Sequence, residues 1–457
     1  MTDTICALAT APGGAIGIIR ISGPQALEIL SHVFQGSGDV QAFAANTIHY
    51  GHLVESDAVP QHPIPLDDVL VSIFRAPHSY TGEDSVEISC HGSRYILNKV
   101  LELLVDNGCR MANPGEYTMR AYLNGKMDLS QAEAVADLIA SGNKASHQMA
   151  MSQLRGGISS ELARLREQLL KLTSLLELEL DFSDHEDLEF ANRSELSELA
   201  QKIDNRITTL AQTFEAGQAM KHGIPIAIVG KTNVGKSTLL NQLVGEDRAI
   251  ISNIHGTTRD TIEDEIEIDG ILYRFIDTAG LRQTSDEIER IGIERTMKAI
   301  EKARIVVWLF DTKPSIAEMQ EMHTLTEGKR RINVLNKADL IDEDTYLPFM
   351  VPMVLVSAKY GTHINTLKKR IIEESRIAEL IGNDNDVIIS NARHYDVLTR
   401  AHEGISRVLD GLQQQLSGDL LAEDLRMVLD TLAEITGGQI TPQETLNHIF
   451  SSFCVGK

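Results

Sequence analysis

Short apolar runs alternate with amphipathic stretches through the middle of the chain. Several runs have the length and composition of strands buried in a parallel sheet: Ile224–Val229, Tyr273–Ile276, Ile305–Phe310, Ile332–Leu335 and Met353–Val356. The stretch after the first run, Ser237–Leu243, has the spacing of an amphipathic helix. The pattern predicts a self-contained α/β domain over residues 222–376.

The N-terminal part of the chain mixes strand-like and helix-like patterns. Ile16–Ile21, Val69–Phe74 and Val86–Cys90 are predicted to be strands. Arg94–Asp106 places its apolar residues on one face of a helix. Residues 1–118 are therefore predicted to form an α+β domain.

Helical patterns flank the α/β domain on both sides. Leucines at spacings of three and four from Leu162 to Leu180 predict a long helix, and Ser130 is the expected N-cap of an earlier one, with Glu133 completing a capping box. Helical character returns after the polar run Gly382–Asp386. We expect residues 119–221 and 377–457 to form one helical domain into which the α/β domain is inserted.

A phosphate-binding loop follows the first predicted strand of the α/β domain. Residues 230–237 have the form G-x-x-x-x-G-K-S between a strand and a helix. Glycines let backbone N–H groups surround phosphate oxygens at the positive end of the helix dipole. Lys236 is expected to contact the β- and γ-phosphates, and the Ser237 hydroxyl to coordinate Mg²⁺.

Three further motifs each follow a predicted strand and indicate the nucleotide. They are Asp277-Thr278-Ala279-Gly280, Asn336-Lys337-Ala338-Asp339 and Ser357-Ala358-Lys359. The Asp339 carboxylate can accept hydrogen bonds from N1–H and the exocyclic amine of guanine, whereas adenine would leave it unpaired at a cost of about 1–3 kcal/mol. The order and spacing resemble Ras-like GTPases of the translation-factor class. Leu281 replaces the glutamine that orients water in Ras-type enzymes, so another group must do this.

Composition and charge limit the partners and the cellular compartment that can be expected for this chain. The formal net charge of -23 argues against broad electrostatic docking to nucleic acid, so an RNA substrate would need a local basic patch or a basic partner. The four cysteines, Cys6, Cys90, Cys109 and Cys454, show no zinc spacing and suit a reducing compartment. The chain has neither a signal-peptide pattern nor a membrane-length apolar run. We expect a cytoplasmic protein.

The whole chain resembles the MnmE/TrmE family of tRNA-modification GTPases. The resemblance rests on short motifs in order around the GTPase motifs: Arg20-Ile21-Ser22-Gly23, Thr81-Gly82-Glu83-Asp84, Pro114-Gly115-Glu116-Tyr117, Leu123-Asn124-Gly125-Lys126, Gly256-Thr257-Thr258-Arg259-Asp260, Glu289-Arg290-Ile291-Gly292 and Phe453-Cys454-Val455-Gly456-Lys457. It implies a homodimer that works with an FAD-dependent partner of the MnmG/GidA type. Together they would add a carboxymethylaminomethyl group at C5 of the tRNA wobble uridine, with tRNA held mostly by the partner.

The resemblance also implies the residues of the GTPase site. K⁺ would be bound by Asn233, Ser252, Ile254 and Thr257, Mg²⁺ by Ser237 and Thr258, and Glu289 and Lys236 would be catalytic. The residues alone favour an ordinary exposed glutamate at Glu289 over a catalytic one. The residues expected at the GTP site are Asn233, Val234, Gly235, Lys236, Ser237, Thr238, Ser252, Asn253, Ile254, His255, Gly256, Thr257, Thr258, Asp277, Thr278, Ala279, Gly280, Asn336, Lys337, Ala338, Asp339, Ser357, Ala358 and Lys359.

The N-terminal domain of the family resembles folate-binding aminomethyltransferases. This implies a site for 5-formyl- or methylene-tetrahydrofolate at Arg20, Glu87, Lys126 and Lys457, with Cys454 as a candidate catalytic thiol. A cation suits the glutamate tail of a folate and a carboxylate suits the N–H donors of its pterin ring. The fold class expected is thus multidomain, with a folate-binding and dimerising α+β domain at 1–118, a helical domain, and an inserted Ras-like P-loop GTPase domain.

The chain departs from the family pattern at two positions, and two alternative functions remain open. Asn113 stands where a basic residue is usual, which would weaken a contact to the folate tail, and Ser252 replaces threonine but keeps a hydroxyl. One alternative is a ribosome-assembly or signalling GTPase without group-transfer chemistry. The other is a stand-alone folate-dependent transferase whose GTPase is regulatory.

Overall fold

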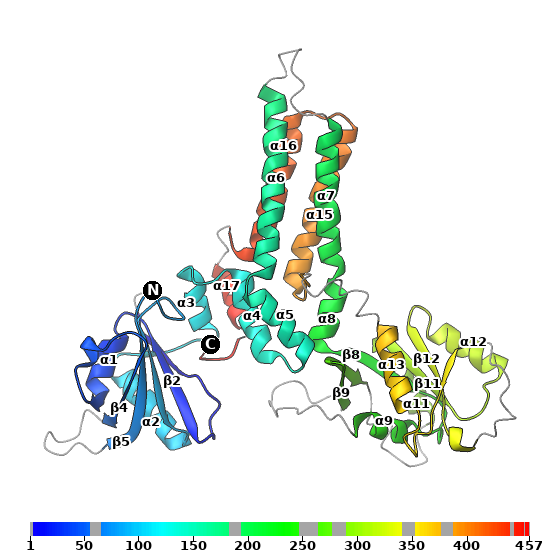
Figure 1. Ribbon diagram of the computed structural model, residues 1–457, viewed down its shortest axis with the longest axis horizontal. Helices are drawn as coiled ribbons and strands as arrows, with labels where there is room; N and C mark the ends of the chain where they lie inside the picture. Colours follow the sequence, from blue (N-terminus) through cyan, green and yellow to red (C-terminus); the bar gives the residue numbers. More distant parts are fainter. Residues whose placement is uncertain are drawn as a thin grey trace. The chain divides into compact units, whose positions relative to one another are not determined.

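The computed structural model describes residues 3–54, 65–181, 193–245, 264–276, 289–340, 352–375, 387–438, 443–451 and 453–456. The chain forms two compact units, coloured by sequence in Figure 1. The first comprises Met1–Ile139, Gln153–Glu167 and Arg426–Lys457, and the second Ala140–Ser152 and Gln168–Leu425. No helix among the described residues is both long and apolar enough to cross a membrane.

The first unit is built on a seven-stranded sheet with the strand order β3-β4-β5-β6-β2-β1-β7. The strands are β1 (Ile5–Leu8), β2 (Ile16–Ser22), β3 (Phe34–Gly36), β4 (Thr47–Val54), β5 (Pro65–Phe74), β6 (Ser85–His91) and β7 (Arg110–Met111). Helices α1 (Ala26–Val33) and α2 (Arg94–Asp106) pack their apolar faces on it, with Leu97, Val100 and Leu104 buried against the strands. The predicted strands and the predicted helix at Arg94–Asp106 are confirmed.

The opposite face of this sheet is less covered. Ile48, Ser72, Glu87 and Arg20 are register partners in turn across β4, β5, β6 and β2, so their side chains lie in one row on one face. Large apolar side chains on these strands remain exposed, at 67% for Ile48, 60% for Tyr50 and 46% for Leu70. An ion pair and an apolar surface therefore share this face.

Helices from both ends of the chain complete the first unit. They are α3 (Glu116–Leu123), α4 (Leu129–Ala140), the start of α6 (Gly157–Asp181), the end of α16 (Gly418–Thr436) and α17 (Gln443–Ser451). Leu446 and Phe450 of α17 pack with Leu129 and Ala132 of α4. Val455 forms an isolated antiparallel bridge with Pro114, which brings the C-terminal segment to the loop before α3.

The capping box of α4 differs from the prediction. Asp128, not Ser130, caps the helix: its Oδ1 accepts from the Gln131 backbone N–H at 3.0 Å, while Gln131 Oε1 accepts from the Asp128 N–H at 3.0 Å. Ser130 already lies inside the helix and donates to Asp128 Oδ1 at 2.7 Å. The prediction was wrong because Asp-x-x-Gln and Ser-x-x-Glu overlap here, and the Ser159 hydroxyl, which donates to Asp128 Oδ2, favours the first.

The second unit contains a six-stranded sheet with the strand order β13-β12-β11-β8-β10-β9, parallel except for the β10–β9 pair. Its strands are β8 (Ile224–Val229), β9 (Asp264–Ile268), β10 (Ile271–Phe275), β11 (Ile305–Phe310), β12 (Arg330–Leu335) and β13 (Met353–Leu355). Helices α9 (Lys236–Val244) and α13 (Ile364–Ser375) share one apolar cluster with the sheet, and α11 (Glu289–Lys302) and α12 (Ile316–Leu325) share another. The predicted α/β pattern is confirmed.

Helices precede and follow this sheet in the sequence. Before it come α5 (Lys144–Leu154), α6, α7 (Arg193–Gln212) and α8 (Phe214–His222), and after it α15 (Ala392–Gln413), α16 and α17. Helices α7 and α15 lie side by side (Figure 1), and the His402 ring of α15 contacts Asp204 of α7 at 2.5 Å. The α/β sheet is thus flanked in sequence by helices that pack against each other.

Candidate functional site

The loop between β8 and α9 has the backbone geometry that a phosphate-binding loop requires. Gly235 has φ +96°, and a Cβ there would overlap the Asn336 side chain, so only glycine fits. Asn233 also adopts a left-handed conformation, with φ +64°. The Lys236 ammonium donates to the carbonyls of Gly230 and Lys231, each at 2.7 Å, and burial lowers its pKa.

Asn336–Asp339, hereafter the base motif, is joined to this loop by side-chain hydrogen bonds. Asn336 Nδ2 donates to the Val234 carbonyl at 2.8 Å, and its Oδ1 accepts from the Ala358 N–H at 2.9 Å. Asp339 Oδ1 accepts from the Ser357 hydroxyl at 2.5 Å. Three motifs that are far apart in sequence therefore meet at the carboxyl ends of parallel strands, where open α/β sheets bind ligands.

The described part of the predicted nucleotide site is incomplete. Ser237 and Thr238 lie in the first turn of α9, and Lys359 is exposed with its ammonium 4.9 Å from the Tyr360 ring centroid. Glu289 is the first residue of α11, but its side chain lies outside the described residues. The remaining predictions also lie outside them: Ser252, Asn253, Ile254, His255, Gly256, Thr257, Thr258, Asp277, Thr278, Ala279 and Gly280. Of the predicted metal ligands, only Asn233 and Ser237 are described.

Two charged contacts near this site were not predicted. Lys337 Nζ donates to Asp311 Oδ2 at 2.6 Å, and Lys231 of the phosphate loop pairs with Glu318 of α12. Asp311 directly follows the predicted strand Ile305–Phe310. The rule that polar residues at strand ends form sites would have identified Asp311, whereas no sequence signal identifies Glu318.

In the first unit, the predicted folate residues Arg20 and Glu87 lie opposite each other on β2 and β6. Arg20 Nη2 and Glu87 Oε1 are 2.7 Å apart, and Arg20 Nη1 donates to the Gly456 carbonyl at 3.4 Å. The Arg20 guanidinium also lies 5.7 Å from the Tyr80 ring centroid and 5.6 Å from that of Tyr117. The C-terminal segment and two aromatic rings thus meet at one cation.

The structure shows no direct contact between the Arg20–Glu87 pair and the side chain of Lys126 or Cys454, the other described residues predicted for this site. Lys126 is exposed, and its ammonium donates to the Pro77 carbonyl at 2.8 Å, at the start of the loop that carries Tyr80. Cys454 is exposed, and its carbonyl accepts from the Gly115 N–H at 3.4 Å. Lys457 lies outside the described residues. Tyr80 was not predicted, and Tyr117 was known only as the last residue of the Pro-Gly-Glu-Tyr motif, without a role.

A buried ionic cluster supports this part of the molecule. The Arg120 side chain is 1% exposed and pairs with Glu116 at 2.9 Å, with Glu83 at 3.1 Å and with Asp3 at 2.9 Å. Glu116 also binds Arg110 at 2.5 Å and the Asn113 backbone N–H at 2.8 Å. The backbone N–H of residue 113 therefore helps to fix Glu116 of the Pro-Gly-Glu motif, and this contact does not depend on the Asn113 side chain.

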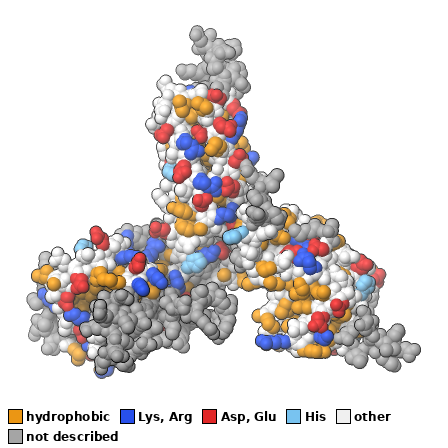
Figure 2. Space-filling model, turned by 180° about the vertical axis from the view of Figure 1, so that it is seen from behind, with side chains coloured by type: hydrophobic (Ala, Val, Ile, Leu, Met, Phe, Trp, Pro, Cys, Tyr) orange, Lys and Arg blue, Asp and Glu red, His pale blue; other side chains and the backbone are white. Residues whose placement is uncertain are grey.

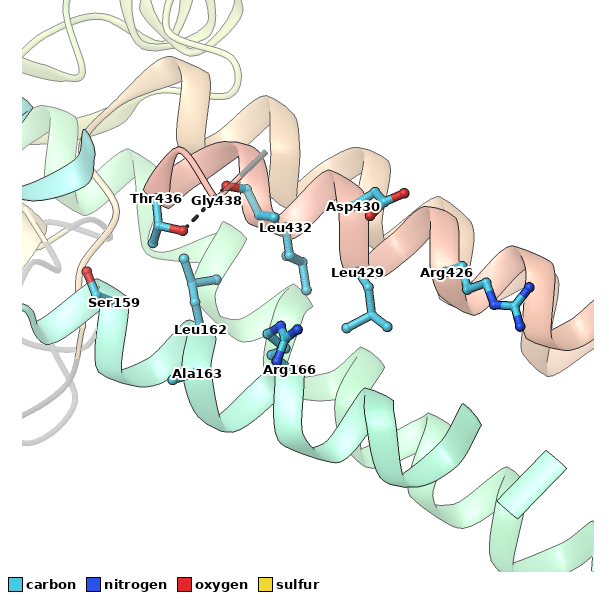
Figure 3. Close-up of a pocket in the computed structure, with 11 residues that line it drawn as sticks. Ser159, Leu162, Ala163, Arg166, Arg426, Leu429, Asp430, Leu432, Thr436 and Gly438 are labelled. Atoms are coloured by element: carbon cyan, nitrogen blue, oxygen red, sulfur yellow. Dashed lines mark hydrogen bonds between the residues drawn. The ribbon is translucent and has the colours of Figure 1, made fainter. Parts of the chain in front are cut away.

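A pocket with a cavity volume of about 400 Å³ lies between α6 and α16 within the first unit (Figure 3). Leu162 of α6 points toward Leu429 and Leu432 of α16, and Ala163 and Arg166 of α6 also line the pocket. None of the residues predicted for nucleotide or folate lines it. We assign it no role in the sites above.

Known sequences resemble this chain over its whole length. The protein-family model of the GTP-binding protein TrmE N-terminus matches residues 4–126, and that of the MnmE helical domain matches residues 129–454. The tRNA modification GTPase MnmE of Phocaeicola vulgatus is 50% identical, with 100% of this chain and 99% of the relative covered. That of Parabacteroides distasonis is 50% identical, with 100% of both chains covered.

Among solved structures, the FeoB G domain of Methanococcus jannaschii is 28% identical, with 33% of this chain and 96% of that domain covered and a TM-score of 0.24. The family models and the full-length relatives agree with an N-terminal TrmE domain followed by an MnmE helical domain. The chain is therefore a GTPase that acts in tRNA modification, and it belongs to the MnmE family of tRNA modification GTPases.

Proposed function

We propose that this protein is a potassium-dependent GTP hydrolase. With an FAD-dependent partner of the MnmG type, it adds a carboxymethylaminomethyl group at C5 of the tRNA wobble uridine, using a one-carbon tetrahydrofolate. Folate-dependent group transfer is supported by one observation. Arg20 contacts both Glu87 and the Gly456 carbonyl on one face of the N-terminal sheet. A signalling or ribosome-assembly GTPase has no use for such a site, and family membership favours tRNA modification.

The nucleotide chemistry is assigned to the loop after β8 and to the base motif. Lys236 would bind the β- and γ-phosphates, and its partly buried position lowers the pKa of its ammonium group. Ser237 would hold Mg²⁺, which supplies charge neutralisation on the phosphates. Asp339, fixed by Ser357, would accept the guanine N–H donors.

Potassium is assigned to the phosphate loop through Asn233. Its left-handed backbone sits at an exposed position directly before Val234, and its amide oxygen is a suitable ligand for a hard cation. A bound K⁺ would supply positive charge where negative charge develops during phosphoryl transfer. Ser252, Ile254 and Thr257 would be the further K⁺ ligands, Thr258 the second Mg²⁺ ligand and Glu289 the residue that orients water.

The folate is assigned to the open face of the N-terminal sheet. The Glu87 carboxylate can accept pterin N–H donors, while Arg20 and Lys126 offer positive charge to the glutamate tail. The side chains of Arg20 and Glu87 are 20% and 27% exposed, so each is fixed yet accessible. Lys457 and Cys454 on the C-terminal segment would complete this site, with Cys454 exposed as a reactive thiol must be.

The same face supports homodimerisation. Exposed Ile48, Tyr50 and Leu70 form an apolar surface of the kind that mediates association. A two-fold pairing would bury the same surface on both copies. Two folate sites would then lie at the edge of one interface, since Ile48 and Arg20 share a row of the sheet.

The acidic balance supports a division of labour with the partner. Along the helices visible in Figure 2, Lys and Arg side chains are interspersed with Asp and Glu. Together with the net charge of -23, this favours a partner that supplies most of the tRNA contacts. The helices that flank the GTPase domain in sequence would transmit its nucleotide state to the rest of the protein.

Reconstitution tests the proposal. Full-length protein, the FAD-dependent partner, tRNA, GTP, K⁺, methylenetetrahydrofolate and glycine are combined, and the mass of the wobble nucleoside is measured. The folate supplies the methylene carbon and is released as tetrahydrofolate, while glycine supplies the nitrogen and the carboxymethyl part of the new group. We expect the modified uridine only when all components are present. Arg20→Ala should abolish the modification and retain GTP turnover, whereas Arg94→Ala, at an exposed position of α2, should retain both. Full modification without folate or without GTP would contradict the proposal.

A further inference from the structure

Asp311 lies beside the base motif at the end of a neighbouring strand. Phe310 and Leu335 are register partners on β11 and β12, and the Asn336 N–H donates to the Phe310 carbonyl at 2.8 Å. Asp311 and Lys337 therefore leave the same edge of the sheet from adjacent strands. Their side chains meet there, with Lys337 Nζ and Asp311 Oδ2 2.6 Å apart.

The backbone of Lys337 is held in an unusual conformation. Its φ of +61° costs a non-glycine residue about 1 kcal/mol or more, and such residues persist where their surroundings fix them. Asn336 is fixed on one side by Val234 and Ala358, and the Ala338 N–H donates to the Val356 carbonyl at 3.1 Å on the other. With the backbone held, the contact with Asp311 determines the direction of the lysine side chain.

The strand order places this contact between the two halves of the nucleotide site. Strand β11 lies between β8, which leads into the phosphate loop, and β12, which leads into the base motif. A nucleotide with phosphates at the first and its base at the second must pass its ribose across the end of β11. The Lys337 side chain crosses from β12 to β11 at this point.

The contact between Lys337 and Asp311 contributes little to the stability of the fold. The side chains of Lys337 and Asp311 are 39% and 28% exposed, and ion pairs this accessible add at most about 1 kcal/mol to stability.

Asp311 differs in origin from the other partners of the base motif. Of the described side-chain partners of the base motif, Asp311 alone comes from outside the phosphate loop and the Ser357–Lys359 motif. Its carboxylate also acts on the phosphate loop, since Glu318 first and Asp311 at longer range raise the pKa of Lys231.

We propose that Asp311 is a positioning residue for the nucleoside part of the guanine nucleotide. It holds Lys337 across the end of β11, so that the lysine stem supports the ribose and base. This inference rests on the nucleotide site proposed above, and it adds a residue that belongs to none of the motifs.

A double-mutant cycle in the full-length protein tests the inference. GDP affinity is measured by calorimetric titration for the parent, Asp311→Ala, Lys337→Ala and the double variant. We expect Asp311→Ala to raise the Kd for GDP about tenfold, as for loss of one charge-assisted contact. The double variant should bind no more weakly than Lys337→Ala. Asp311→Asn, which keeps an acceptor oxygen, should show a smaller rise. Glu321→Gln, at an exposed position of α12, removes one charge and should leave the Kd unchanged.

Steady-state GTP hydrolysis separates positioning from folding. For Asp311→Asn, we expect KM to rise while kcat at saturating GTP stays within about twofold of the parent. Three outcomes would overturn the inference. They are additive effects of Asp311→Ala and Lys337→Ala on GDP binding, an unchanged Kd for GDP in Asp311→Ala, and a fall in both Tm and kcat of Asp311→Asn. A parent protein that fails to bind GDP would instead contradict the proposed nucleotide site, so the two failures are distinguishable.

Discussion

Asn336 donates a hydrogen bond from Nδ2 to the Val234 carbonyl, 2.8 Å away, and so links the base motif to the phosphate loop. Its Oδ1 accepts from the Ala358 N–H at 2.9 Å, which links both to the loop after β13. Asn336 is only 3% exposed, so no water can readily replace either bond. A single buried amide therefore joins three loops of the proposed nucleotide site.

Replacing this amide should cost both stability and affinity. Asn336→Ala leaves a buried carbonyl and a buried N–H unpaired, so we expect the free energy of unfolding to fall by about 2 kcal/mol. The Kd for GDP should rise, because the loops lose their common partner. Urea unfolding and calorimetric titration measure the two effects. Asn241→Ala, at an exposed position of α9, is the control and should change stability by no more than about 0.5 kcal/mol. Equal behaviour of the two variants would show that the link is unimportant.

Asp339 should determine the preference for guanine. In Asp339→Asn, the amide keeps an acceptor for the Ser357 hydroxyl but presents an N–H₂ donor to the base. Xanthine has an acceptor where guanine has its exocyclic amine, so the ratio of kcat/KM for XTP over GTP should rise about tenfold or more. Competition kinetics with the two nucleotides measure this ratio. If the ratio does not change, Asp339 does not contact the base.

The C-terminal segment should depend on Gly456. This residue has φ +91°, and a Cβ would overlap the Leu8 carbonyl. Gly456→Ala should therefore displace the segment from Arg20 and weaken binding of 5-formyltetrahydrofolate, measured by equilibrium dialysis. Gly108→Ala has a similar φ of +106° but open space around the added Cβ, so it should cost stability without affecting folate binding. Equal folate affinities for both variants would contradict the role given to the segment.

The ionic cluster around Glu116 should make the N-terminal unit sensitive to acid. Burial acts to raise the pKa of Glu116, but hydrogen bonds from Arg110, the Asn113 N–H and Arg120 outweigh it and hold the pKa below its ordinary value. A lowered pKa in the folded state means that the stabilisation is complete above the unfolded pKa of about 4.3 and is lost as the pH falls below it. Urea unfolding should show a steeper loss of stability below about pH 4.5 for the parent than for Glu116→Gln. Equal slopes would contradict this. At neutral pH the variant should be less stable by about 3 kcal/mol, because Arg120 stays buried.

Much of the fold could be predicted because buried strands leave a local pattern. The apolar runs at β8 and β11 and the amphipathic pattern at α2 matched the structure at both ends. The capping box at Asp128 could not be chosen correctly, since the deciding contact comes from Ser159, far away in sequence. Local propensity contains no information about such tertiary contacts.

In the candidate sites, too, short local motifs could be predicted from the sequence, whereas contacts made by the fold could not. Spacing alone predicted the phosphate loop and the base motif, because each motif is short and follows a strand. The family resemblance pointed to Arg20 and Glu87 as separate residues, but their pairing depends on the register of β2 and β6 and was not predicted. Tyr80 and Tyr117 lie close to Arg20 only in the folded chain, and nothing local in the sequence predicted that they contact it.

Potassium, held through Asn233, is proposed to activate GTP hydrolysis. The most direct test is GTP turnover by the full-length protein in K⁺ and in Na⁺ at equal ionic strength, for the parent and for Asn233→Ala. We predict that K⁺ raises kcat of the parent about tenfold or more over Na⁺, as expected for a charge that stabilises the transition state. Asn233→Ala should turn over GTP slowly and equally in both salts while binding GDP nearly as the parent does. Equal turnover of the parent in K⁺ and Na⁺, or undiminished K⁺ stimulation of Asn233→Ala, would contradict activation by potassium at Asn233.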